Sequence, residues 1–331
     1  MAGCQSDGGG GAVSGTPTPG ADEIAVERTI ARSRALLDGL AAVHRSGARW
    51  TAAAERVTAG HRAQLLLLNV TQTAESPAPS EAGTPEGSAS TPPQTTTAPG
   101  PTTPQELVTA QRDAAVEALV DLRTTSAPVA VKLSKIAGSR AVQADLLAKA
   151  AGLKAPGELP LPDAETTDPV SPQISSQARS DGTGTDASPT GTTAELPETT
   201  LKALSTLLAG EHAAVFAYGT ITARIPSSSR ARAQNLWNEH LRNREELIRR
   251  IRAGGGRPPA AEAAYGLGDE DLSTVSGVKA LAATVEDGLA SVAIEAVGQA
   301  EPVDRVRIAA TLIGAARNSA RWSGNPASLP G

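Results

Sequence analysis

One helical segment, residues 201–225, constrains the fold of this chain more than any other stretch. Its large apolar residues recur at alternating spacings of three and four, which is typical of a helix that buries one face against other helices. These residues are Leu201, Leu204, Leu208, Val215 and Tyr218. Glu211 lies in the middle of that face, where a carboxylate costs several kcal/mol unless it is paired or bound to a metal. The segment therefore predicts a helical bundle with a polar centre, and the partners of Glu211 decide its chemistry.

The composition also favours helices and excludes several classes of protein. Of the 331 residues, 40% are hydrophobic but only 2% are aromatic, so a core must be built from Ala, Leu, Val and Ile. Alanine-rich sequence favours close-packed helices over sheets. A formal net charge of −5 argues against a broad nucleic-acid surface, which needs a basic excess. No apolar run approaches the roughly 18 residues of a transmembrane helix, and nucleotide-binding glycine motifs are missing.

Breaks in the helical pattern divide the chain into two halves of four helices each. The helices expected in the first half (21–152) lie near 22–45, 49–69, 104–123 and 128–151. Those expected in the second half (196–322) lie near 197–224, 227–253, 273–300 and 301–322. Each half has a long connection between its second and third helices, as ferritin-like bundles do. The expected fold is therefore all-α, with two tandem four-helix, ferritin-like bundles.

The segments outside these helices are rich in Thr, Ser, Pro and Gly. Such a composition cannot bury enough apolar surface to fold. We interpret the segments as a flexible N-terminal tether (1–20), a disordered insert (71–103), a disordered linker (153–195) and an irregular tail (323–331). A flexible linker of this length predicts that the two halves are loosely coupled.

A weak internal repeat relates the halves. The motif Gly60-His61-Arg62 corresponds to Glu239-His240-Leu241, and residues 136–140 (IAGSR) correspond to residues 313–317 (IGAAR). The polar core positions expected in the first half are His61, Gln64, Gln111 and Arg140. No carboxylate is among them, so we expect no metal there.

In the second half, counting along the helices places further polar side chains at the depth of Glu211. His240 lies about as far from the turn between its helix and the preceding one as Glu211 does, and Glu286 falls in the middle of the seventh helix. Arginines are expected to complete the charge balance. The predicted buried polar layer comprises Glu211, His240, Arg244, Glu286 and Arg317.

Three interpretations of Glu211 with His240 stay open. The two residues can form a buried hydrogen-bonded pair that fixes the register of the bundle, which is the interpretation we favour. They can bind iron or another divalent metal together with Glu286. They can also act as a general acid and base, although no nucleophile or cleft is evident in the sequence. We therefore expect no catalytic residue and no cofactor, and regard a metal-binding oxidase or storage protein as the alternative.

Three stretches of the second half resemble an actinobacterial ferritin-like family of unknown function that is frequently found on lipoproteins. They are LLAGEHAAVFAYG (207–219), WNEHLRNREEL (237–247) and IGAARNSARW (313–322). The resemblance implies a ferritin-like fold but no reaction. The di-iron sites of ferritin-like proteins need a Glu-x-x-His motif on two helices, and this chain has none. The residues three positions before His240, His212 and His61 are Trp237, Ala209 and Thr58.

The single cysteine of the chain lies at the fourth position, in Met1-Ala2-Gly3-Cys4. This tetrapeptide resembles the end of a bacterial lipoprotein signal, in which the cysteine is lipidated. The charged and apolar segment of such a signal does not precede it, so we expect the true gene start to lie upstream. The sequence then predicts an exported protein, anchored through Cys4 to the outer face of the cytoplasmic membrane. We expect it to serve as a non-catalytic binding or scaffold module for an unidentified protein of the envelope.

Overall fold

The computed structural model describes residues 19–43, 47–69, 100–161, 195–325 and 329–330. Within these ranges the chain is all-helical, which confirms the predicted fold class. The helices of the first half are α1 (Ala21–Ala42), α2 (Ala48–Leu67), α3 (Pro104–Asp121) and α4 (Ala127–Ala151). Those of the second half are α5 (Glu198–Arg224), α6 (Ser227–Ala253), α7 (Val275–Gln299) and α8 (Pro302–Ser323). Most of the predicted tether, insert and linker lies outside the described residues.

Local signals set the helix ends close to the predicted positions. The Thr103 side chain accepts a hydrogen bond from the backbone N–H of Glu106, and the Glu106 side chain accepts one from the backbone N–H of Thr103, so α3 begins with a complete capping box. At the start of α7, the Thr274 side chain accepts a hydrogen bond from the backbone N–H of Gly277. Gly152 and Gly324 end α4 and α8 in the left-handed conformation, with φ of 70° and 68°, that glycine adopts most readily.

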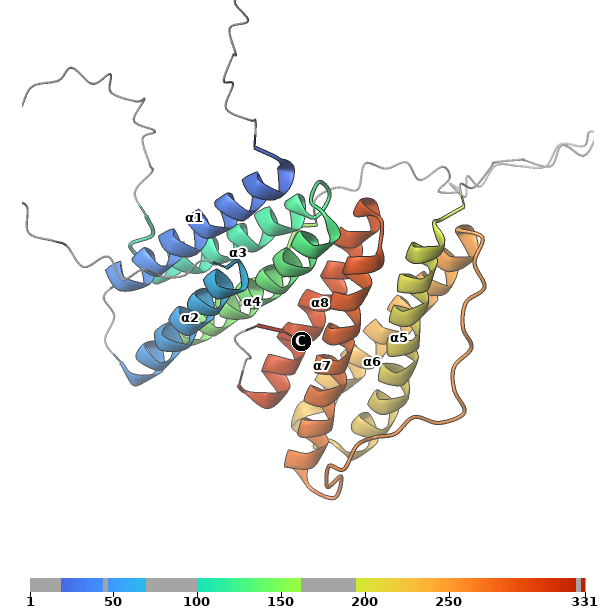
Figure 1. Ribbon diagram of the computed structural model, residues 1–331. Helices are drawn as coiled ribbons and strands as arrows, with labels where there is room; N and C mark the ends of the chain where they lie inside the picture. The colour runs from blue at the N-terminus through green and yellow to red at the C-terminus, as the bar shows by residue number, and fades with distance from the viewer. Residues whose placement is uncertain (1–18, 44–46, 70–99, 162–194, 326–328, 331) are drawn as a thin grey trace, which may run out of the picture.

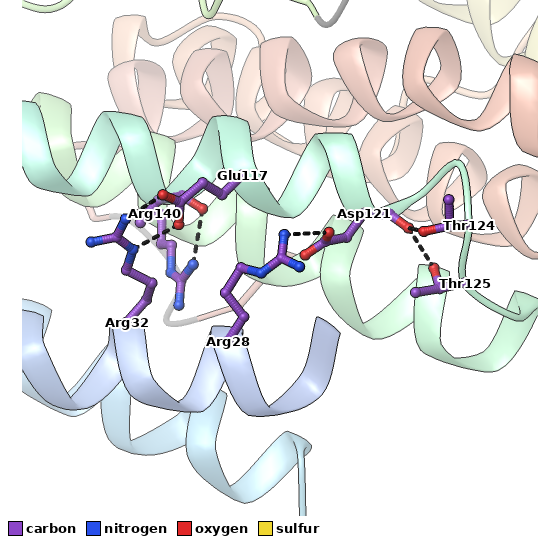
Figure 2. Close-up of polar contacts among 8 residues, drawn as sticks. Arg28, Arg32, Glu117, Asp121, Thr124, Thr125 and Arg140 are labelled. Carbon is purple, nitrogen blue, oxygen red and sulfur yellow. Dashed lines mark hydrogen bonds and ion pairs between the residues drawn. The ribbon is translucent and has the colours of Figure 1, made fainter. Parts of the chain in front are cut away.

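The four helices of the first half close into a ring. α1 packs on α2 and α3, and α4 packs on α3 and α2. Two arginines of α1 tie it to α3, as Figure 2 shows: Arg28 donates to Asp121 at 3.0 Å, and Arg32 binds Glu117 with both ends of its guanidinium group. All four edges of this bundle are thus in contact.

The second half is a bundle that is open along one edge. α5 packs on α6 and α7, and α7 packs on α8, but α6 and α8 make no comparable contact among the described helices. The connection from α6 to α7 runs along the outside of the bundle beside α5 (Figure 1), where Tyr265 contacts the ring of Phe216 with 5.6 Å between centroids. This long crossover places α7, rather than α6, at the centre of the packing.

One hydrophobic cluster spans the two halves, so the expectation of loose coupling is wrong. α4 packs against α7 and α8 (Figure 1). A single cluster of buried residues includes Leu119 and Leu133 of the first half and Ile308 and Leu312 of the second. Residues 153–161, which the composition assigns to the linker, lie against this core, and Leu159 packs on it. The short apolar side chains of α4 allow this helix to pack on both sides at once.

No described helix combines the length and the apolarity that crossing a membrane requires.

Candidate functional site

His240 lies at the centre of the polar layer in the second half. Its Nδ1 is 2.8 Å from Oε2 of Glu211 on α5, and its Nε2 is 3.5 Å from Oε1 of Glu286 on α7. Both carboxylates are fully buried, and His240 is 3% exposed. The structure thus brings together Glu211, His240 and Glu286, three of the five residues of the predicted layer.

Three further side chains hold the two carboxylates in place. The Tyr218 hydroxyl donates to Oε1 of Glu286 at 2.5 Å, and the Trp322 indole donates to the Tyr218 oxygen at 3.0 Å. Asn243 donates to Oε1 of Glu211 at 3.1 Å. The sequence assigned Tyr218 to the apolar face of its helix, and it gave no role to Asn243 or Trp322. The position of Asn243 three residues after His240 was the available signal for it, because residues so spaced share a helix face.

The charge of this group follows from its burial and its partners. Burial alone lowers the pKa of a histidine, but the hydrogen bond to Glu211 and the ion pair with Glu286 outweigh this effect and raise the pKa of His240 to about 10. His240 is therefore a cation at neutral pH. Burial and the Glu286 charge raise the pKa of the Tyr218 hydroxyl, which stays protonated and can donate.

The prediction that arginines complete this layer is wrong. Arg244 turns toward solvent and donates to Glu245, its neighbour along the chain. Arg317 leaves the bundle and binds Asp145 of α4 through two bonds of 2.9 and 2.7 Å. A protonated His240 already supplies a positive charge between the carboxylates, so a buried guanidinium group there would add an uncompensated charge.

A cleft lies beside this polar layer, along the open edge between α6 and α8. It encloses about 290 Å³. Beside the cleft, charged side chains bridge the two helices: Arg250 of α6 donates to Asp304 of α8 at 2.9 Å, and Arg307 of α8 lies 3.5 Å from Glu246 of α6. Residues 158–161 of the first half form one wall, so the cleft is built from both halves. Its lining comprises Glu158, Leu159, Leu161, Glu239, His240, Asn243, Glu286, Leu289, Arg307, Ala310, Thr311, Ile313, Gly314, Ala315, Arg317 and Asn318.

Two buried polar atoms of the layer lack hydrogen-bond partners within the described part of the chain. They are Oε2 of Glu286 and Nε2 of His240, whose only charged neighbour among these residues is Oε1 of Glu286 at 3.5 Å, and both residues line the cleft. Buried polar atoms are paired in nearly all native structures, so unpaired ones that border a cavity indicate a partner from outside the chain. Glu239 lines the same cleft, and burial raises the pKa of its carboxyl, with the Glu286 charge adding to the effect.

The fit of this site to a metal is partial. Glu211 holds Nδ1 of His240, which leaves Nε2 and Glu286 as candidate ligands. Across residues 19–43, 47–69, 100–161, 195–325 and 329–330, no group of three or more His, Cys, Asp and Glu side chains is arranged to hold a metal ion. Because the two carboxylates flank the imidazole on opposite sides, they do not converge on a common point.

The first half has a counterpart of this layer, formed by amides. Nδ1 of His61 is 3.2 Å from Oε1 of Gln64, and its Nε2 is 2.6 Å from Nε2 of Gln111 on α3. Arg140 points into this core and donates to Gln64 and Ser33. Burial and the Arg140 charge lower the pKa of His61 to about 3, so this histidine is neutral.

Comparisons with known proteins cover the second half. Residues 203–331 match the model of a domain of unknown function (DUF4439). Among solved structures, the chain is similar to a conserved hypothetical protein, rv2844, from Mycobacterium tuberculosis, with 28% sequence identity over 38% of this chain and 96% of that chain, and a TM-score of 0.36. No curated protein matches the chain. The matched region contains Glu211, His240 and Glu286 but not the wall formed by residues 158–161.

Proposed function

We propose that this protein is a non-catalytic binding module of the cell envelope, and that the cleft between α6 and α8 receives its ligand. The observation that supports this proposal is the buried Oε2 of Glu286, which has no hydrogen-bond donor among the described residues, in the lining of a cavity of about 290 Å³. Beside it, Nε2 of His240 has only the ion pair of 3.5 Å with Oε1 of Glu286 in this part of the chain. Cavities near this size, with apolar walls and a few convergent polar groups, are typical of small-molecule sites.

A binding role fits these residues better than acid–base catalysis does. A general base works best when its pKa lies near the working pH. The carboxylates around His240 raise its pKa to about 10, so at neutral pH the ring holds a proton and cannot accept another. His240 is therefore suited to fix a charge distribution in the cleft rather than to transfer protons.

Blocking the cleft tests the binding role. A Cβ at Gly314 would project into the cleft, since the nearest atom it would meet is Oε1 of Glu239 at 4.0 Å. We expect Gly314→Phe to fold normally and to lose the fragments that ligand-observed NMR screening detects on the unmodified chain. Gly314→Ala, which adds one methyl group, serves as the control and should retain them. A screen that finds no fragment, or fragments that Gly314→Phe still binds, would refute the proposal.

The membrane tether is a separate part of the proposal. The tetrapeptide ending in Cys4 resembles a lipoprotein cleavage site, although these residues lie outside the described part of the chain. Expression of the gene with its native upstream DNA, in the presence of an alkyne-labelled fatty acid, should label the protein and place it in the membrane fraction. Cys4→Ser should abolish both. Equal labelling of the two forms would exclude lipidation at this cysteine.

A metal-binding protein that uses Glu211, His240 and Glu286 is the second candidate. One observation favours it: metal-ligating histidines usually donate their other ring N–H to a carboxylate, and Glu211 accepts from Nδ1 of His240. His240 would have to lose its Nε2 proton before it could coordinate a metal. Elemental analysis after equilibration with Fe²⁺, Zn²⁺ or Mn²⁺ tests this role. Stoichiometric metal that is lost in Glu211→Ala would favour it over an organic ligand.

A further inference from the structure

We infer that the ligand of this cleft is a small organic cation, an amine or guanidinium compound with a short apolar body. This inference rests on the proposed function, and it adds the chemical class of the ligand. The charges that border the cleft, the unpartnered carboxylate oxygen and the apolar walls each support it.

The cationic side chains of the lining are largely engaged elsewhere. Arg317 is bound by Asp145 at 2.7 Å, and it also donates to the backbone oxygens of Pro156 and Gly157. Arg307 also lines the cleft, and it lies 3.5 Å from Glu246, which is not part of the lining. Each guanidinium group thus faces a carboxylate outside the cleft lining, and a second arginine shares each of these carboxylates: Arg321 also binds Asp145, and Arg249 also binds Glu246.

Three carboxylates line the cleft beside one histidine. Glu158, Glu239 and Glu286 line it, while protonated His240 is shared between Glu286 and Glu211. Burial is the main cause that raises the pKa of the Glu239 carboxyl, and the Glu286 charge adds to it. A cation placed among these groups would favour their ionised forms.

The unpartnered atom of Glu286 specifies the kind of contact. Tyr218 donates to its Oε1, whereas Oε2 has no donor among the described residues although the side chain is fully buried. An ionised carboxylate can accept hydrogen bonds but cannot donate them, so the missing partner is a donor. An ammonium or guanidinium N–H would satisfy it and would also form a charge-assisted bond.

The walls of the cleft favour an organic ligand over a bare ion. Leu159 and Leu161 lie on the wall from the first half, and Leu289 and Ile313 lie on α7 and α8. These side chains would cover an apolar body next to the charged group. The two leucines lie outside the region that matches the family model, so this part of the wall comes from the rest of the chain.

Three compounds of one shape and different charge test the inference. Isothermal titration calorimetry of the full chain at pH 7 with benzylamine, benzyl alcohol and benzoate should show benzylamine binding at least about ten-fold more tightly than benzyl alcohol, because a hydrogen bond to a charged group adds that much. Benzoate should bind most weakly. Glu286→Gln and Glu239→Gln should each reduce the preference for benzylamine, and Gly314→Phe should abolish binding of all three compounds.

The outcomes separate this inference from the proposed function. Equal affinities for benzylamine and benzyl alcohol, both lost in Gly314→Phe, would overturn the cation but leave the cleft as a binding site. Preferred binding of benzoate, or binding of other screened fragments without benzylamine, would overturn the cation too. Failure of every fragment would refute both. Benzylamine binding that Gly314→Phe does not change would place the amine elsewhere and refute the inference.

Discussion

In the first half of the molecule His61 lies beside two amides and is neutral, whereas in the second half His240 lies between two carboxylates and is protonated. Burial is nearly the same, since His61 is 0% and His240 3% exposed. The difference comes from the neighbours. The pKa of His61 is lowered to about 3, and that of His240 is raised to about 10.

The arginines of the repeat explain how each core keeps one fixed cation. Arg140 points into the first bundle, where burial lowers its pKa to about 10 without removing its charge at neutral pH. Burial and, after it, the Arg140 charge lower the pKa of His61 and keep it neutral. The corresponding Arg317 turns outward to Asp145, and His240 takes the positive charge of the second bundle. A second buried cation would need a compensating carboxylate. The core that contains the Arg140 guanidinium group therefore keeps its histidine neutral, and the core without a guanidinium group has a protonated histidine.

The side chains that bridge this edge in the first bundle are replaced by a cleft in the second. Between α2 and α4, Gln64 donates to Ser139 and to Gln143, which closes the edge of the first bundle. In the second bundle Asn243 turns to Glu211 instead. No comparable amide bridge between α6 and α8 is present among the described residues, and the space between these helices is the cleft.

The largest effect is expected at the carboxylate that the first half lacks. Glu211→Ala should lower the free energy of unfolding by about 3–5 kcal/mol, because it removes the nearer of the two carboxylates that compensate the protonated His240. Ser33→Ala, which removes a hydroxyl that accepts from Arg140 at 2.9 Å, is the matched change in α1 and should cost about 1 kcal/mol. Chemical denaturation measures both. Equal costs would remove the distinction between the two cores.

The two histidines should give stability an opposite dependence on pH. The folded pKa of His240 is raised from 6.5 to about 10, so its contribution is complete below 6.5 and is lost as pH rises toward 10. The folded pKa of His61 is lowered from 6.5 to about 3, so stability is lost as pH falls from 6.5 toward 3. Each loss should be on the order of a few kcal/mol.

Denaturation curves across pH, with His240→Gln and His61→Gln as comparisons, separate the two contributions. His240→Gln should flatten the alkaline side, and His61→Gln should reduce the slope on the acid side. NMR titration of the imidazole signals gives an independent measurement. A His240 that loses its proton near 6.5 would contradict the assigned charge.

Because Arg317 of α8 binds Asp145 of α4, this ion pair should stabilise the packing of the two halves. Asp145→Ala should lower the free energy of unfolding by about 1–3 kcal/mol, because Arg317 is 9% exposed and loses its carboxylate. Arg28→Ala, which breaks a pair with an arginine side chain 45% exposed, should cost less. Chemical denaturation compares them. If Asp145→Ala proved the milder change, the pair would not hold the halves together.

The smallest effect concerns helical glycines in the two halves. Gly314→Ala should stabilise the protein by about 0.5–1 kcal/mol, because alanine favours the helix and the added Cβ meets no atom closer than 4.0 Å. Gly39→Ala in α1 should destabilise it, since its Cβ would lie 2.5 Å from Cγ of Pro101. Thermal melting resolves changes of this size. Stabilisation by both changes would contradict the close packing of α1 on Pro101.

The sequence by itself determined the helices and much of the polar layer. Apolar spacing and local caps specify where each helix begins and ends, because those interactions reach only a few residues along the chain. The distances along the chain from the turn between α5 and α6 also place Glu211 and His240 at one depth in the bundle. Glu286 is predicted at the same depth because it lies in the middle of α7.

Only the tertiary structure decided the partners. Arg317 and Asp145 are 172 residues apart, and nothing in the local pattern indicates that α4 packs against α8. The wall at 158–161 has the composition of a linker, yet it is held by contacts with a helix far along the chain. The direction of a long side chain depends on which opposite charges and donors lie within its reach, and that depends on how distant helices pack. The cleft, and with it the proposed ligand site, follows from that packing.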